Sequence, residues 1–217
     1  MALPEDERIS EIVNTLKERH ETGSYNSDPF RVLIFTILSQ RTKDENTARA
    51  GERLFSVFET PHEMADADEA ELQRLIKPSG FYKVKARRIK EVSKIISKKY
   101  GGSVPDDLVE LLSLPGVGRK TANCVLVYGF GKKAIPVDVH VHRISNRLGL
   151  VGTKRPEETE KGLMKKVPRR FWRELNELFV KFGQDLCRPI NPKCNECDIR
   201  HLCKFGSNYG RDLFRKR

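Results

Sequence analysis

Four cysteines stand close together near the C-terminal end of the chain, at Cys187, Cys194, Cys197 and Cys203, with the spacing C-x6-C-x2-C-x5-C. Four thiolates can hold a zinc ion or an iron–sulfur cluster. Structural zinc sites usually consist of two close pairs of ligands, and only Cys194 and Cys197 form such a pair. The spread-out spacing therefore favours an iron–sulfur cluster, with zinc and disulfide bonds as the alternatives.

A glycine-rich turn far upstream could bind an anion. The letters L-P-G-V-G occupy residues 114–118, and Arg119 and Lys120 follow at once. Gly116 and Gly118 carry no Cβ atom that would block a close approach. The first amides of the helix expected after the turn have no partner within that helix, so they can bind a phosphate beside the charge of Arg119. An ordinary turn between two helices is the simpler interpretation.

The overall charge fits the same kind of ligand. Lysine and arginine number 41 against 30 acidic residues, which gives a net charge of +11 and an isoelectric point near 9.5. A basic protein gains affinity for a polyanion by releasing its counterions. No apolar run approaches the roughly 20 residues that span a membrane, and the first ten residues are too acidic for a secretory signal. We therefore expect double-stranded DNA as the partner and a reducing cytoplasm as the setting, with no membrane association.

Lys120 and Asp138 are the residues best suited to chemistry on DNA. Lys120 lies in the first turn of the expected helix, whose positive end favours the neutral amine that attack on a sugar carbon requires. It could instead be one more cation that contacts DNA. Asp138 stands where a helix N-cap belongs, and its carboxylate could stabilise an oxocarbenium-like sugar. Capping alone is the alternative, and the two roles are compatible.

The region around these residues closely resembles the endonuclease III family of helix-hairpin-helix DNA glycosylases. The matching letters are LPGVGRKTAN, VDVHVHRISNRL and the cysteine spacing, with weaker matches at LSQRT and GFYKVKA. The resemblance implies that Lys120 is the nucleophile, that Asp138 is an essential carboxylate and that the four cysteines hold a [4Fe–4S] cluster. It also implies a six-helix lobe at 22–134, a cluster lobe made of 1–21 and 135–217, and a DNA cleft between them.

The activity implied by this resemblance is base excision repair. We expect a bifunctional DNA glycosylase and AP lyase that removes oxidised pyrimidines of the thymine glycol type and nicks the strand 3′ to the abasic site by β-elimination. One alternative is a mismatch glycosylase acting on uracil or thymine opposite guanine. Another is a non-catalytic helix-hairpin-helix module that binds DNA. A monomer in the cytoplasm of a prokaryote, associated with the nucleoid, completes the expectation.

Several further residues are candidates for contact with DNA. By resemblance, Gln40 enters the duplex, and the loop before Phe81 supplies a second wedge. Phe81 departs from the leucine expected at its position, which leaves the preference for the opposite base in doubt. Gln40 could instead simply end a helix, and Phe81 could belong to the core. His140 is a candidate for the base pocket, and Arg188 and Lys193 make the loop between the first two cysteines basic.

The elements that position these residues are predicted to be helical throughout. Apolar residues recur at helical spacing along most of the chain, and strand patterns are nearly absent, so we predict an all-α fold. Val57 is expected to close a helix that Pro61 stops, and Val84 to begin the buried face of a long helix ending before Gly101. The stretch GFGKKAIP at 129–136 interrupts the helical pattern and could join two lobes. Cys124, outside the spacing pattern, is expected in the core.

Overall fold

The computed structural model describes residues 3–23 and 27–208 of the chain. It is 66% helical and has no strand among the described residues, which confirms the all-α prediction. No helix in these residues is long and apolar enough to cross a membrane. The elements are α1 (Glu5–Arg19), α2 (Pro29–Ser39), α3 (Asp44–Phe55), α4 (Pro61–Asp66), α5 (Glu69–Leu75), α6 (Tyr82–Tyr100), α7 (Leu108–Leu112), α8 (Arg119–Cys124), a π-helical turn (Val125–Gly129), α9 (Val139–Leu148), α10 (Pro156–Lys166), a 3₁₀ turn (Arg169–Phe171), α11 (Trp172–Asp185), two further 3₁₀ turns (Cys194–Glu196 and Arg200–Leu202) and α12 (Lys204–Asn208).

The chain forms two compact units. One contains residues 24–132, and the other combines residues 1–23 with residues 133–217. The change of unit between residues 132 and 133 falls inside the interrupted stretch 129–136. Each unit is described separately below. The lobe boundaries drawn from the sequence, at 21/22 and 134/135, stay a prediction.

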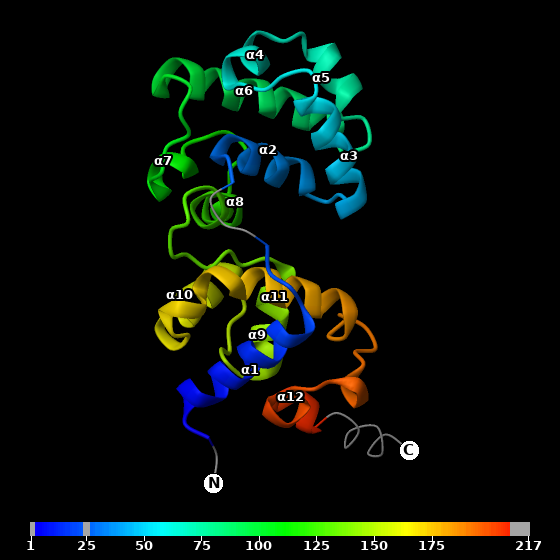
Figure 1. The fold of residues 1–217 in the computed structure, drawn as a ribbon, viewed down its shortest axis with the longest axis vertical. Coiled ribbons are helices and arrows are strands. Elements are labelled where there is room, and N and C mark those ends of the chain that lie inside the picture. Colours follow the sequence, from blue (N-terminus) through cyan, green and yellow to red (C-terminus); the bar gives the residue numbers. More distant parts are fainter. Residues whose placement is uncertain (1–2, 24–26, 209–217) are drawn as a thin grey trace. The chain divides into compact units, whose positions relative to one another are not determined.

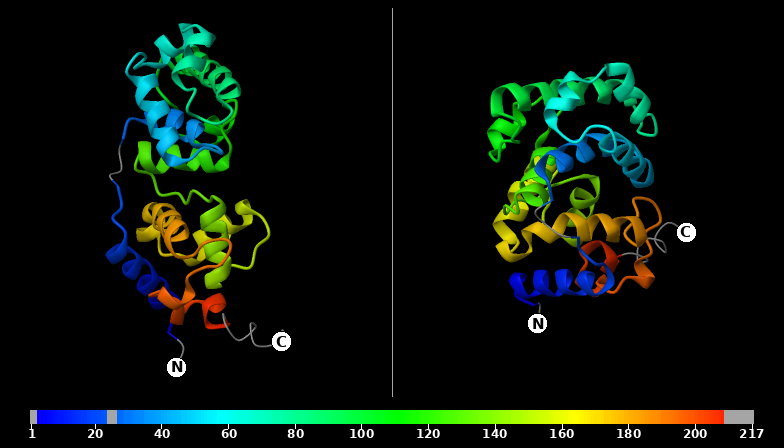
Figure 2. Two further views of the ribbon diagram at one scale, coloured as in Figure 1. Left: turned by 90° about the vertical axis from the view of Figure 1, so that its right-hand side faces the viewer. Right: turned by 45° about the horizontal axis from the view of Figure 1, so that its top comes forward.

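Helix α2 is the central helix of the first unit (Figure 1). Asp28 caps it by accepting a hydrogen bond of 2.8 Å from the Arg31 amide, and Pro29 takes the first helical position, where no amide is needed. The helix packs against α3, α6, α8 and the π-helical turn, so most of its apolar surface is buried. Figure 2 shows α6 running beside the short helices α4 and α5, which it also contacts.

The second unit is organised around α9 and α11. Helix α11 packs against both α1 and α9, while α9 also contacts α10 and α12. Helix α1 buries Ile9, Ile12, Val13 and Leu16 in the core of this unit, as the helical spacing predicts. Trp172 opens α11 and donates a 2.8 Å hydrogen bond from its indole nitrogen to the carbonyl of Val167, so its one polar group is satisfied inside the core.

Two details of the predicted helices are wrong. Helix α3 ends at Phe55, and Val57 is exposed beyond it. Pro61 opens α4 rather than ending α3, and Thr60 and Glu63 form a reciprocal capping box there. On α6, Val84 is 51% exposed, whereas its neighbour Lys85 is only 3% exposed. The face of α6 that is buried in its first turn is therefore polar.

Candidate functional site

The glycine-rich turn adopts the helix-hairpin-helix arrangement predicted from its sequence. Helix α7 leads into it, the Val117 amide donates to the Leu114 carbonyl at 3.2 Å, and α8 leads out. Gly116 has φ +74°, and a Cβ on it would lie 2.7 Å from the Cδ atom of Arg88. A Cβ on Gly118 would meet nothing within 4 Å. Gly116 is therefore required by the fold, whereas Gly118 leaves open space at the surface of the turn.

Arg119 and Lys120 occupy the first turn of α8 and are both partly buried. The four residues that follow them, 121–124, are all buried, so α8 presents its first turn at the edge of the unit and packs the rest inside. Cys124 is among the buried residues, in agreement with its predicted place in the core. Lys120 thus lies directly beside the hairpin turn.

Gln40 belongs to the same unit and contacts that turn. Its side-chain amide donates to the Gly116 carbonyl at 3.3 Å, and the Arg88 guanidinium donates to its side-chain oxygen at 3.5 Å. Gln40 is the C-cap of α2, and Arg41 after it has φ +53°, a left-handed conformation that is uncommon for arginine. Gln40 therefore ends α2 and also places its side chain in contact with the hairpin turn.

Phe81 lies at the tip of a second loop in this unit. It is 63% exposed, which excludes the alternative that it is a core residue. Its φ is +58°, and the Arg41 guanidinium lies 5.9 Å from the centre of its ring. A left-handed backbone costs phenylalanine free energy, and residues held in this way cluster at functional sites, so the exposed ring marks a candidate contact surface.

Asp138 is the N-cap of α9, as its position in the sequence predicts. Its Oδ1 atom accepts hydrogen bonds of 2.9 Å from the amides of His140 and Val141. The buried Asn176 donates from Nδ2 to the Pro136 carbonyl at 3.0 Å and approaches Oδ2 of Asp138 at 3.5 Å. Oδ1 thus caps α9, and Oδ2 lies beside the side chain of Asn176.

The two histidines of α9 have different surroundings. His140 accepts a hydrogen bond of 3.1 Å at Nδ1 from Arg143, and it packs so closely on Gly183 that a Cβ there would lie 2.4 Å from this nitrogen. His142 pairs with the Thr159 hydroxyl at 2.7 Å, so it joins α9 to α10 as a packing residue. His140 stays the candidate for the base pocket.

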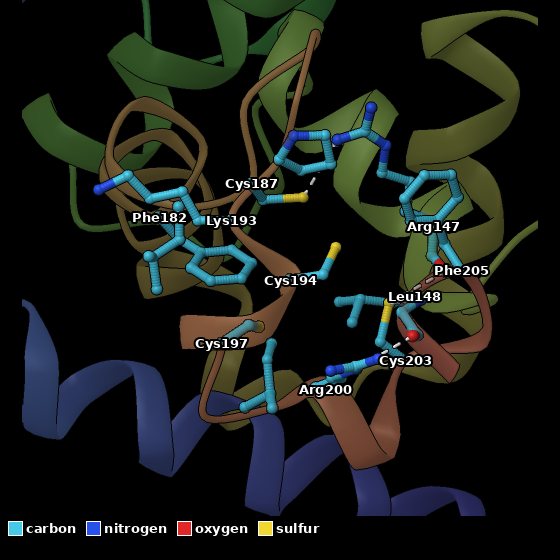
Figure 3. Close-up of a pocket in the computed structure, with 14 residues that line it drawn as sticks. Arg147, Leu148, Phe182, Cys187, Lys193, Cys194, Cys197, Arg200, Cys203 and Phe205 are labelled. Atoms are coloured by element: carbon cyan, nitrogen blue, oxygen red, sulfur yellow. Dashed lines mark hydrogen bonds between the residues drawn. The ribbon is translucent and has the colours of Figure 1, made fainter. Parts of the chain in front are cut away.

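The four tail cysteines line one pocket in the second unit (Figure 3). Figure 3 shows Phe182 on one side of this pocket and Arg147 with Phe205 on the other. No three histidine, cysteine or carboxylate side chains within residues 3–23 and 27–208 are already arranged as metal ligands. Whether the pocket suits a cluster is therefore judged from the chemistry of its donors.

That chemistry fits an iron–sulfur cluster. Burial raises the pKa of Cys197 to about 11, and burial also raises the pKa values of Cys194 and Cys203, because a thiolate is costly in this apolar pocket. Bound iron would offset that cost, since metal ligation requires deprotonated thiols. Polar hydrogens already point at two sulfurs: Arg147 donates to Cys187 Sγ at 3.4 Å, and the Gly206 amide donates to Cys203 Sγ at 3.2 Å. Such donors tune iron–sulfur centres.

Arg147 also fixes the basic loop between the first two cysteines. Its guanidinium donates to the carbonyl of Arg188 at 2.6 Å and to that of Pro189 at 2.9 Å. The side chain of Arg188 is exposed, while Lys193 lies 3.5 Å from Glu196 at the other end of the loop. The loop is therefore held by its backbone, while the exposed Arg188 side chain donates from Nε to the Asp185 carbonyl at 3.1 Å.

Sequence reasoning missed three residues that organise these sites: Lys85, Arg147 and Asn176. Most of their contacts are with residues about 40 or more positions away along the chain. No local pattern records such contacts. The local signals were the positions of Lys85 within the matching letters GFYKVKA and of Arg147 within VDVHVHRISNRL.

Comparison with known proteins identifies relatives along the whole chain. Residues 34–169 match the HhH-GPD superfamily of base excision DNA repair proteins. The chain is 52% identical over 209 residues to endonuclease III of Thermotoga maritima, a match that covers 96% of this chain and 98% of that protein.

Solved structures agree with this sequence similarity. A trapped endonuclease III–DNA covalent intermediate, in an estranged-adenine complex, matches with a TM-score of 0.86 and 35% identity, covering 96% of this chain and 99% of that one. A thermostable thymine-DNA glycosylase matches with a TM-score of 0.81 and 25% identity, covering 93% of this chain and 98% of that one.

Proposed function

The chain belongs to the endonuclease III family, base excision repair enzymes that are DNA glycosylases with AP lyase activity, and we propose that it removes oxidised pyrimidines of the thymine glycol type from duplex DNA. The observation that carries this proposal is the placement of Lys120 directly beside the hairpin turn, with the Gln40 side chain in contact with that turn. An amine, an anion-binding turn and a residue suited to enter DNA then belong to one unit.

In the proposed reaction, the neutral amine of Lys120 attacks C1′ of the damaged nucleotide. As the bond from Lys120 to C1′ forms, the C1′–N bond breaks, and the base leaves with the electron pair and takes the proton that the amine loses. The C1′–O4′ bond then breaks, O4′ takes a proton, and the opened sugar is joined to Lys120 as a protonated Schiff base. The imine acidifies the C2′ proton. Loss of that proton expels the 3′ phosphate by β-elimination, and hydrolysis of the imine then releases Lys120.

Asp138 is proposed to stabilise the positive charge that develops on the sugar as the base departs. The two capping amides both donate to the carboxylate and hold it in one orientation. A fixed negative group aimed at developing charge acts without reorganisation, which makes electrostatic stabilisation of this kind effective. The position of Asn176 beside Oδ2 supports this role.

The lesion must first leave the base stack, since a base inside a duplex cannot be attacked. We propose that Gln40 and Phe81 enter the duplex and fill the resulting gap. The exposed ring of Phe81 can stack on neighbouring bases, which supports a role as a wedge. His140 is proposed to line the pocket that receives the extruded base.

The remaining candidates are proposed to bind the phosphate backbone. The turn at Gly116 and Gly118, with the charge of Arg119, suits one phosphate, and Arg188 and Lys193 suit others. We propose that Cys187, Cys194, Cys197 and Cys203 hold the [4Fe–4S] cluster that the family carries. When bound, such a cluster supplies a rigid cross-link that keeps the basic loop in shape.

Two other functions would use the same residues. Similarity to a thymine-DNA glycosylase supports a mismatch enzyme acting on uracil or thymine opposite guanine, yet the identity to it, 25%, is half that to the Thermotoga maritima endonuclease III. A DNA-binding module without catalysis would keep the hairpin and the cysteine pocket as scaffold. Lys120 is the residue that such a module would not need.

Borohydride reduction in the presence of abasic duplex DNA tests the proposal, because only a Schiff base is reduced to a stable covalent adduct. We expect the protein to be trapped, Lys120→Ala to abolish trapping while keeping its affinity for duplex DNA, and Lys133→Ala, which alters an exposed lysine, to be trapped normally. An adduct mapped to another side chain would refute the role of Lys120.

The lesion class is tested with duplexes that carry thymine glycol, uracil opposite guanine or thymine opposite guanine. We expect thymine glycol to be released fastest under single-turnover conditions. Faster release of uracil or thymine would instead establish the mismatch activity. We also propose that the protein acts as a monomer on nucleoid DNA in a prokaryotic cytoplasm, which the bacterial relative supports.

A further inference from the structure

Lys85 is a buried cation without a carboxylate among its hydrogen-bond acceptors. Only 3% of the residue is exposed, and four neutral oxygens lie within hydrogen-bond distance of its ammonium group, which shares its three N–H donors among them. They are the carbonyls of Leu38 and Gln40, both at 2.6 Å, the hydroxyl of Thr42 at 2.8 Å and the hydroxyl of Ser79 at 2.9 Å. Burying an ammonium group is costly, so a position that keeps one needs a reason.

The carbonyls explain part of that reason. Helix α2 ends at Ser39, and the last carbonyls of a helix have no amide partners within it. A cation is favoured at this negative end of the helix dipole. Lys85 therefore acts as a C-terminal cap of α2 supplied by α6, and it bonds the backbone of Gln40 itself.

The hydroxyls explain the rest, because they connect two loops. The Gln40 loop comprises residues 38–42, and the Phe81 loop comprises residues 79–81. Thr42 accepts from the Gly80 amide at 3.1 Å, and Ser79 donates to the Leu38 carbonyl at 3.0 Å. Lys85 bonds to both loops at once. Its ammonium group is the centre of a network that joins them.

We propose that Lys85 is a positioning residue, whose ammonium group holds the Gln40 loop and the Phe81 loop at a fixed separation so that both enter a duplex together. The inference rests on the proposed function, in which these loops enter the duplex. Lys85 itself touches neither DNA nor the reacting sugar, since it lies beneath the loops and bonds their backbone and their hydroxyls. Its effect should therefore appear in the opening of the duplex rather than in the chemistry.

The test compares three variants. Lys85→Met keeps the length and the apolar stem of the side chain and removes the donated bonds. Ser79→Ala removes one acceptor of Lys85 and the bond that Ser79 donates to the Leu38 carbonyl, and it leaves the Lys85 charge in place. It therefore still reports on the network should Lys85→Met fail to fold. Lys94→Met is the matched control, because it removes an exposed positive charge from the same helix.

Three readouts separate positioning from catalysis. The first is single-turnover release of thymine glycol from a duplex. The second is fluorescence of 2-aminopurine placed beside the lesion, which reports unstacking of the duplex. The third is borohydride trapping on an abasic site in single-stranded DNA, where Lys120 acts without any duplex to open. Thermal unfolding and iron content are measured for every variant.

We expect Lys85→Met to lower duplex release on the order of 100-fold, the effect of displacing groups by about 1 Å, with a matching loss of the 2-aminopurine signal. Ser79→Ala should lower both roughly tenfold, as expected for one lost hydrogen bond to a charged group. Trapping on single-stranded DNA should stay near the wild-type level in both variants, and Lys94→Met should match the wild type throughout.

Equal duplex release by Lys85→Met and Lys94→Met would overturn the proposal. An equal loss on duplex and single-stranded DNA would also overturn it, because the defect would then lie in the chemistry or the fold. If Lys85→Met does not fold, release of thymine glycol from a duplex by Ser79→Ala at the wild-type rate would overturn the proposal. Failure of the proposed function looks different: the wild-type protein itself would not be trapped, while the 2-aminopurine signal would still report on Lys85.

Discussion

Asp138 offers a test that separates helix capping from catalysis. Asparagine is as good an N-cap as aspartate, because its side-chain oxygen accepts the same amide bonds, but it carries no charge. Asp138→Asn should therefore keep the two 2.9 Å bonds to the His140 and Val141 amides and lose the carboxylate charge, together with the long 3.5 Å contact that Oδ2 makes with Asn176. Asp138→Ala loses both. The pair of variants isolates the charge.

The loss of the cap and the loss of the charge have different expected magnitudes. Loss of the cap in Asp138→Ala should cost about 1 kcal/mol, which lowers the unfolding midpoint by about 2–4 °C for a chain of this size. Asp138→Asn should unfold at nearly the wild-type temperature. Single-turnover release of thymine glycol should nevertheless fall about 100- to 1,000-fold in both, the usual effect of removing one electrostatic contact to a transition state.

Thermal unfolding followed by circular dichroism and base release followed by gel electrophoresis measure the two effects. Near-normal release by Asp138→Asn, together with a defect in Asp138→Ala that follows its lower stability, would refute the catalytic role. Asp138 would then be a cap and nothing more. Equal losses of stability in the two variants would refute the account of the cap instead.

Three further predictions concern pH, packing and the basic loop. Burial, with a smaller contribution from Arg88, lowers the pKa of Lys85 from 10.5 to about 8, so between these values the unfolded chain binds a proton that the folded protein has released. The free energy of unfolding of the wild type relative to Lys85→Met should therefore rise by up to about 3 kcal/mol from pH 8 to pH 10.5. Unfolding midpoints of both proteins at the two ends of this range would measure the change. Asn176→Ala removes the donor to the buried Pro136 carbonyl and should cost about 1–3 kcal/mol, with reduced base release, whereas an unchanged midpoint would contradict the buried bond. Arg188→Ala should reduce the slope of log affinity against log salt by about 1 for damaged and undamaged duplexes alike, and an unchanged slope would exclude a phosphate contact.

Helical spacing and capping residues predicted most of the fold. Asp138 as the N-cap of α9 and Gly101 after α6 both stand where the sequence places them. These features are local, since a cap or a break acts within a few residues of itself. The start of α4 is also a local feature. The letters T-P-H-E at residues 60–63 are a capping-box pattern, although apolar spacing alone predicted that Pro61 ends a helix.

The first turn of α6 shows why the remainder was not predictable. Apolar periodicity placed Val84 on the buried face, but the structure buries Lys85. The surface beneath that turn is polar, because the carbonyls at the end of α2 lie there, and only the fold brings them together with α6. Arg147 and Asn176 were hidden for the same reason. A sequence pattern shows which side chains can donate or accept hydrogen bonds. The topology of the fold decides which backbone groups they meet.

The backbone conformation of the candidate contact loops has a consequence for how this protein could change. Among the described residues, positive φ angles outside glycine occur at Arg41, Phe81 and Asn191, which lie in the Gln40 loop, the Phe81 loop and the basic loop between the first two cysteines. Left-handed geometry costs arginine or phenylalanine about 1 kcal/mol or more, which glycine or asparagine would avoid. Selection for heat resistance alone would therefore favour replacement of Arg41 and Phe81, so their retention in a thermostable lineage would be a sign of continued selection for repair.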